Sequence, residues 1–296
     1  MLLLKRNYCD YEPVRATIDR ARVIVVDSLI YSTTDLSDVA AQEPDFNAEE
    51  WVKEERTIAG FAIGNIVQNV KKLVESPEVQ VVSLAKISPQ IVKDFDPDAI
   101  ILSGTLRDFD MYQSSILKNV STFLEATTVP VLGICGGHQL VGQAFGLPIV
   151  TLDHLEPHQR RHNRLREYEY RFVKVIEPQD PIFKNVLTDH DIRRRSRGNT
   201  IWVWQNHGLM VDGMPDGFQL LAKGYVCQNQ MMVKRGDGQL IYTVQFHIEK
   251  SFEDWRKTPS RWEHPNESRD GRKLFENFLV EALKHRGQVF HHAQSA

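Results

Sequence analysis

The chain has 296 residues, 42% hydrophobic and 25% charged, which is enough for one large or two small globular domains with a buried core. A net charge of -3 gives no reason to expect nucleic acid as the main partner. No apolar run approaches the roughly 20 residues that a membrane helix needs, so no membrane association is expected. Three scattered cysteines do not form a disulfide framework, and a reducing, cytoplasmic location is the expectation.

The N-terminal part contains a predicted strand, an acidic segment and a predicted helix. Residues 23–26 form a β-branched run that is typical of a central parallel strand, and residues 1–21 before it are interpreted as an N-terminal extension. Residues 31–57 are polar and acid-rich, which indicates a loop or lid and, as a more specific interpretation, a docking surface. From residue 58 to 73 apolar residues recur at helical spacing. Two glycines on one side of this helix would permit close packing against another backbone: Gly60 and Gly64.

Strands alternate with helices in the next part of the chain. We predict strands at 79–84, 99–102 and 130–134, and helices at 89–95 and 114–126. This alternation implies right-handed crossovers and a mostly parallel sheet with helices on both faces, so the predicted fold class is α/β. Ligands of such sheets bind beyond the carboxyl ends of the strands.

The C-terminal half changes to a strand pattern. Strands are predicted at 170–176, 200–204, 218–222, 230–234 and 240–246. Gly236-Asp237-Gly238 has the composition of a hairpin turn, and the last helix is predicted at Gly271–His285. The sequence therefore predicts a smaller antiparallel region beside the parallel sheet, and residues 288–296 are expected to be a flexible tail.

Two basic stretches have alternative interpretations. Residues 153–166 contain three histidines at intervals of four, which could place imidazoles on one helical face: His154, His158 and His162. Pro157 interrupts that pattern and the neighbouring arginines would repel a cation, so we expect no metal. The cluster Arg193–Arg197 is either an exposed loop or a patch that docks an anion or a partner.

A single cysteine lies between a predicted strand and a predicted helix. The apolar run 129–134 ends at Cys135, and Gly136 and Gly137 follow before the helical pattern. Backbone N–H groups and the positive end of the helix dipole would favour a thiolate there, which is the reactive form. On this pattern alone, a buried structural cysteine and a nucleophile are about equally supported.

Two further stretches favour the nucleophile. The run Gln245–Glu249 ends a strand and offers a histidine with a carboxylate two residues on, and Ser103–Thr105 is a small-residue turn after another strand. Together with the cysteine turn they resemble the triad-type, class I glutamine amidotransferase family. That family carries G-x-C-x-G-x-Q at its nucleophile, Q-F-H-P-E near its C-terminus and an S-G-G-like loop upstream. The resemblance covers most of the span Arg22–Leu283, implies a flavodoxin-like fold, and suggests one amidotransferase-like domain over residues 22–287.

The resemblance assigns five residues to the chemistry. Cys135 would attack the side-chain amide carbon of glutamine and form a γ-glutamyl thioester. His247 would hold the thiolate, protonate the departing ammonia and later activate water, and Glu249 would orient the imidazole. Backbone N–H groups at Gly136 and in the Gly104 turn would bind the oxyanion.

The resemblance also implies a substrate pocket and shows two departures from the family pattern. Gln139 would line the glutamine pocket, and the backbone around Asn206 and His207 would contact the substrate. Ile248 stands where the family has proline, which leaves the exact placement of the following carboxylate open. Thr105 stands where a second glycine is common, which suggests a loop that is differently shaped or that rearranges.

Three functions are consistent with these residues. The first is a glutaminase subunit that acts on L-glutamine and delivers ammonia to a separate synthase subunit. The second is a stand-alone hydrolase or peptidase of γ-glutamyl compounds, and the third is a non-catalytic regulatory or binding subunit on the same scaffold. The sequence shows no nucleotide-binding glycine loop, so neither ATP hydrolysis nor a cofactor is expected.

Overall fold

The computed structural model describes residues 15–187, 198–250 and 268–287. One sheet contains β1 (Ile18–Asp27), β2 (Val74–Ser83), β3 (Ala99–Leu102), β4 (Val131–Ile134), β6 (Glu167–Val175), β7 (Thr200–His207), β9 (Phe218–Lys223), β10 (Met231–Gly236) and β11 (Gln239–Val244). The described strands of this sheet lie in the order β2-β1-β3-β4-β11-β10-β9-β6-β7. A second, two-stranded sheet pairs β5 (Ile149–Thr151) with β8 (Leu209–Val211).

The large sheet is parallel at one end and antiparallel at the other. The strands β2, β1, β3, β4 and β11 pair in parallel, and the strands from β11 through β10, β9 and β6 to β7 pair antiparallel. The antiparallel region thus continues the central sheet across its β11 edge, where a two-residue turn joins β10 to β11 at the predicted hairpin. The predicted α/β class is confirmed.

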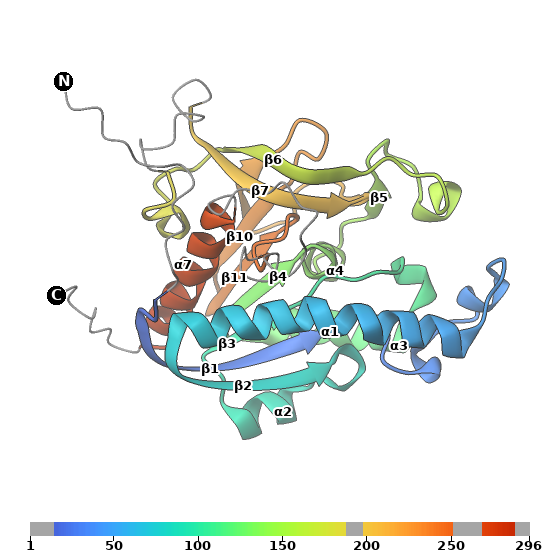
Figure 1. Ribbon diagram of the computed structural model, residues 1–296, viewed down its shortest axis with the longest axis horizontal. Coiled ribbons are helices and arrows are strands. Elements are labelled where there is room, and N and C mark those ends of the chain that lie inside the picture. Colours follow the sequence, from blue (N-terminus) through green and yellow to red (C-terminus); the bar gives the residue numbers. More distant parts are fainter. Residues whose placement is uncertain (1–14, 188–197, 251–267, 288–296) are drawn as a thin grey trace, which may run out of the picture.

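Helices cover both faces of the parallel strands. They are α1 (Ala48–Leu73), α2 (Pro89–Phe95), α3 (Ser114–Ala126), α4 (Gly136–Ala144) and α7 (Arg269–His285). Each face of the sheet has its own hydrophobic core, and successive side chains of β1 point into them alternately. Val23 and Val25 lie in the core under α1 and α7, whereas Ile24 and Val26 lie in the core under α3 and α4. In Figure 1 the long helix α1 runs across the parallel strands, and β6 and β7 form the ribbon on the opposite side of the molecule from α2.

The boundaries differ from the prediction at the N-terminus. The strand β1 begins at Ile18, so the last four residues of the expected extension, 18–21, belong to the sheet. The strand is tied to the rest of the fold, since Thr17 N donates to Leu73 O (3.0 Å) and Thr17 Oγ1 donates to Glu276 (2.8 Å). The remainder of the extension up to residue 14, the cluster 193–197 and the tail 288–296 lie outside the described residues.

The acidic segment 31–57 enters the helix earlier than expected. The helix α1 begins at Ala48, ten residues before the predicted start, so the last part of the segment is helix and not a lid. The side chain of Asn47 accepts hydrogen bonds from the N–H groups of Glu49 (3.2 Å) and Glu50 (3.3 Å). Capping and carboxylates in the first turn both stabilise a helix N-terminus, which gives the acidic residues there a structural role.

One smaller prediction is wrong. No atom lies within 4 Å of a Cβ built on Gly60 or Gly64, so neither glycine packs against another backbone. The helical pattern of the histidine stretch is interrupted, as expected from Pro157: His154 has a φ of 60°, and only residues 157–160 form a short 3-10 turn. Among the described residues, no group of three or more His, Cys, Asp or Glu side chains is arranged to hold a metal ion. Within the same ranges, no helix has the length and apolar character for crossing a membrane.

Candidate active site

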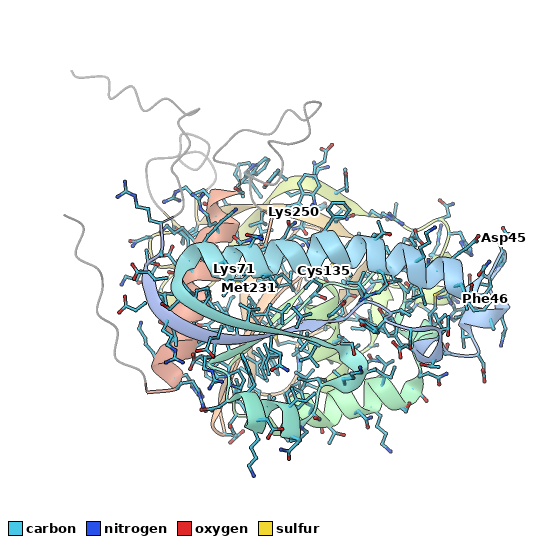
Figure 2. The ribbon with its side chains drawn as sticks, turned by 60° about the horizontal axis from the view of Figure 1, so that its bottom comes forward. Asp45, Phe46, Lys71, Cys135, Met231 and Lys250 are labelled. Atoms are coloured by element: carbon cyan, nitrogen blue, oxygen red, sulfur yellow. The ribbon has the colours of Figure 1, made fainter. Side chains whose placement is uncertain are left out.

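Cys135 occupies a strained turn between β4 and α4. Its φ of 53° and ψ of -104° lie outside the regions that residues with a side chain prefer, and such strain costs on the order of 1–3 kcal/mol. The turn is held by the bond from Cys135 N to Val244 O (2.8 Å), and the side chain is 6% exposed. Figure 2 shows Cys135 near the middle of the molecule. The N-terminus of α4 begins at the next residue, so the sulfur lies at the positive end of that helix.

Two glycines make the turn possible. A Cβ on Gly133 would lie 2.6 Å from Gly137 O, and a Cβ on Gly137 would lie 2.6 Å from Leu102 O. Any side chain at either position would push β4, α4 and β3 apart. This close approach explains why the cysteine is embedded in small residues.

The two predicted oxyanion segments lie on either side of Cys135. A Cβ built on Gly104 would lie 3.6 Å from both Cys135 Cβ and His247 Cε1. A Cβ on Gly136 would lie 2.4 Å from Thr105 N, so the helix start and the loop after β3 are in direct contact. Thr105, which departs from the family pattern, therefore packs directly on Gly136.

The side chains of His247 and Glu249 are in direct contact. His247 Nδ1 lies 2.6 Å from Glu249 Oε1, and both residues follow β11. The backbone is fixed from two sides, because His247 N donates to Trp204 O (2.8 Å) and Asn69 Nδ2 of α1 donates to Glu249 O (2.8 Å). Ile248 is buried, and its Cα would lie 3.0 Å from a Cβ on Gly271 of α7. Isoleucine in place of proline thus leaves the histidine–carboxylate contact intact.

The electrostatics of this pair favour a charged imidazole. Burial lowers the pKa of His247, but the carboxylate of Glu249 and the sulfur of Cys135 outweigh it and raise the pKa to about 10. Burial likewise opposes the charged form of Glu249, yet the adjacent His247 holds the pKa of that carboxyl below its usual value. The arrangement stabilises an imidazolium beside the sulfur at neutral pH.

Two of the three predicted substrate residues, Gln139 and His207, bind the same backbone carbonyl. Gln139 Nε2 donates to Leu209 O (3.0 Å), and His207 Nδ1 donates to the same oxygen (2.9 Å). The other ring nitrogen of His207 lies 3.0 Å from Glu167 Oε2. Asn206, Gln139 and His207 line a cavity of about 150 Å³ that Cys135 also lines. Its volume is well below the roughly 300 Å³ at which drug-sized ligand pockets begin, so it suits an amino acid.

The model of the class-I glutamine amidotransferase family matches residues 62–263 of this chain, which is more than half of it. The chain belongs to this family. The family resemblance carried by the three sequence motifs is therefore confirmed. The matched span includes Thr105 and Ile248, the two positions at which the sequence motifs are expected to depart from the family pattern.

The relatives of this amidotransferase include GMP synthases. It is 27% identical to the glutamine-hydrolysing GMP synthase of Brachyspira hyodysenteriae over 198 residues, which is 67% of this chain and 30% of that protein. It is 31% identical over 167 residues to one subunit of the glutamine-hydrolysing GMP synthase of Methanococcoides burtonii, covering 56% of this chain and 72% of that one. A glutamine amidotransferase of Thermotoga maritima has the same fold, with a TM-score of 0.53, 14% identity and coverage of 89% and 98%. The chain spans less than a third of the length of the Brachyspira protein.

Three arginines of the amidotransferase line the same cavity, and none of them was assigned a role from the sequence. Arg164 makes a two-point ion pair with Asp108 (2.7 and 2.6 Å). Arg107 pairs with Glu54 of α1 and stacks over Trp51, 3.9 Å from the ring centroid. Arg166 differs, because no ion pair or hydrogen bond joins it to any residue in the described ranges.

Residues 105–108, which follow β3 and line the cavity, are called the cavity loop. The part of the acidic segment that belongs to α1 contacts this loop. Glu55 is fully buried, and Arg107 Nε lies 3.4 Å from its Oε1. Burial raises the pKa of Glu55 to about 7, against the Ile30 N–H bond and the nearby arginines, which lower it. The signal for this contact was present in the sequence as a carboxylate on the apolar side of the helical pattern, together with an arginine just after the Ser103–Thr105 turn.

Proposed function

We propose that this chain hydrolyses the side-chain amide of L-glutamine and delivers the ammonia to a separate synthase subunit. The observation that carries the proposal is the close pair of His247 and Glu249, which stands beside Cys135 at the carboxyl edge of the parallel sheet. Cysteine, histidine and a carboxylate in this order provide a nucleophile, a proton carrier and an orienting anion.

The reaction would proceed in two halves. The thiolate of Cys135 attacks the amide carbon, the oxyanion accepts hydrogen bonds from the backbone around Gly104 and Gly136, and His247 protonates the departing ammonia. A γ-glutamyl thioester remains. His247, now neutral, takes a proton from water, and hydroxide attack on the thioester releases glutamate and restores the thiolate–imidazolium pair. Glu249 holds the ring and stabilises its charged form throughout.

Support for a partner comes from the relatives. Three archaeal relatives that are 26–31% identical to this chain are each named as one subunit of a glutamine-hydrolysing GMP synthase, and the chain covers 72–76% of each. A synthase divided into subunits implies a second polypeptide that receives the ammonia. The acidic first turn of α1 is a candidate docking surface, since the same helix contacts the cavity loop through Arg107. The cluster 193–197 is a second candidate.

The experiment that tests the function is hydrolysis of L-glutamine by the purified chain, with ammonia and glutamate both measured. We expect equal amounts of the two products, and added hydroxylamine should divert the acyl group to γ-glutamyl hydroxamate, because a thioester is attacked by that nucleophile. Release only after addition of a synthase would favour the subunit, whereas hydrolysis of γ-glutamyl compounds in preference to glutamine would favour the stand-alone hydrolase. If neither ammonia nor glutamate is released under any of these conditions, the result would support the non-catalytic subunit.

Arg166 suits the carboxylate of the substrate. The positive charges of Arg107 and Arg164 are matched by carboxylates, so Arg166 is the cavity arginine whose charge a ligand can satisfy. Replacing Arg166 with glutamine should raise the KM for L-glutamine about tenfold, the size expected for a solvent-accessible charged hydrogen bond. The kcat should change little, because the contact is remote from the reacting bond.

Two substrate analogues check this assignment. Glutaramate keeps the carboxylate and lacks the amino group. The Arg166→Gln substitution should therefore lower kcat/KM for glutaramate by the same factor as for glutamine. The amide γ-aminobutyramide lacks the carboxylate and should be hydrolysed equally by both proteins. Arg171→Gln, which removes an exposed charge from the strand that begins just after Arg166, is the matched control. Equal losses for both analogues would contradict the assignment.

A further inference from the structure

A buried glutamine contacts the sulfur of Cys135, and none of the roles above uses it. Gln245 directly follows β11, two residues before His247, and is fully buried. Its Nε2 lies 3.7 Å from Cys135 Sγ, within hydrogen-bond reach of a sulfur acceptor. Its backbone is held as well, because Gln245 N donates to Gln230 O (2.9 Å).

The neighbours of Gln245 determine which end of its amide faces the sulfur. Leu209 O is a carbonyl and can only accept, so the group of Gln139 that lies 3.0 Å from it must be the NH2. The same NH2 lies 3.1 Å from the Gln245 side chain, which must therefore present its oxygen. The NH2 of Gln245 is left to face Cys135. Gln139 thus donates to Leu209 O and to the Gln245 oxygen, and Gln245 in turn donates to the sulfur.

We propose that Gln245 is a positioning residue that donates an N–H to the Cys135 thiolate, with Gln139 holding the donor in that orientation. The proposal rests on Cys135 being the nucleophile of the proposed function. A donor can satisfy a thiolate, whereas a thiol is only a weak acceptor, so the contact favours the ionised form. Gln245 donates from the protein interior, because its side chain is fully buried.

The proposal also gives Gln139 a second task. Both hydrogens of its NH2 are used inside the protein, so the group that it can offer to a substrate is its oxygen, which accepts from a donor such as an α-ammonium group. A substrate that binds the Gln139 oxygen would then affect the hydrogen bond from Gln245 to the sulfur, because Gln139 holds Gln245 in place. Binding and activation of the nucleophile are coupled in this arrangement.

The test is the pH dependence of Cys135 alkylation by iodoacetamide, followed by mass spectrometry of the peptide. It does not require glutamine turnover. Gln245→Met keeps the length of the side chain and removes the N–H, so the midpoint of thiolate formation should rise by about 1 pH unit, the size expected for a hydrogen bond to a charged group. Gln245→Glu keeps the shape and places a carboxyl against the sulfur, so it should raise the midpoint further.

Controls separate the proposal from a general effect on folding. Gln205→Met removes another buried amide, which donates to Gln230 and not to the sulfur, and it should leave the alkylation midpoint unchanged. In Gln245→Met, kcat should fall about tenfold while the KM for glutamine stays near that of the wild type. A midpoint in Gln245→Met and Gln245→Glu equal to the wild type would overturn the role of Gln245. Hydrolysis of L-glutamine by Cys135→Ala at the wild-type rate would instead count against Cys135 as nucleophile.

Discussion

Replacing Cys135 with alanine should reduce ammonia release from L-glutamine by about 10⁴-fold or more, the loss seen when a nucleophile is removed from a catalytic triad. The sulfur is the atom that would form the thioester, and the other cysteine of the described ranges, Cys227, is fully buried with its pKa raised by that burial. No second thiol in the part of the chain that the structure describes can therefore take over the attack. The measurement is a coupled glutamate assay over long incubation with high enzyme concentration.

The same position allows a check that activity and folding are separable. Because Cys135 has a φ of 53°, Cys135→Gly should be at least as stable as Cys135→Ala, since glycine adopts that conformation without a steric penalty. Both variants should unfold in a single transition close to that of the wild type and both should be inactive. Glutamine hydrolysis by either variant at the wild-type rate would contradict the thioester mechanism.

Replacing His247 with alanine should cost about 10⁴-fold or more in kcat/KM, and replacing Glu249 with glutamine should cost roughly a hundredfold less than that. His247 transfers protons in both halves of the reaction, whereas Glu249 acts by orienting the ring through its 2.6 Å contact. Parallel measurement of kcat/KM for the two variants tests the order. Equal losses would show that the carboxylate is as essential as the imidazole.

The pH profile of the Glu249→Gln variant tests whether Glu249 raises the pKa of His247. In the wild type, burial lowers the pKa of His247, but Glu249 and Cys135 raise it to about 10, so the imidazolium persists through neutral pH and is lost only as the pH approaches 10. Without the carboxylate the burial penalty remains and part of the compensation is gone. The alkaline limb of kcat/KM should therefore move to lower pH in the variant, and an unchanged limb would contradict this account.

The contact between α1 and the cavity loop connects the proposed docking surface to the site. Arg107 belongs to the loop after β3, yet it pairs with Glu54 and stacks over Trp51 on the helix. The helix also donates through Asn69 to the backbone of Glu249. A partner that moves the first turns of α1 would thus act on two sides of Cys135.

Much of this arrangement could be predicted from the sequence. Helices α2 and α3 and strand β3 lie at their predicted bounds, because each is a short apolar pattern bounded by polar residues or proline. The start of α1 was missed by ten residues, since its first turns are charged and their helical state depends on the Asn47 cap and on Trp51 packing against the core. The start of β1 was missed because its first residues are polar and are held by pairing with β2.

The sequence by itself determined the α/β class, the family and the grouping of Cys135, His247 and Glu249. These features depend on short local patterns, and parallel strands bring their carboxyl ends to one edge whatever the details of packing. Only the tertiary structure decided that Gln245 faces the sulfur, that Arg166 is the cavity arginine without a partner in the described ranges, and that Asn69 supports Glu249. Those contacts join residues up to 180 positions apart. Their side-chain directions follow from how helices and strands pack, which no local pattern specifies.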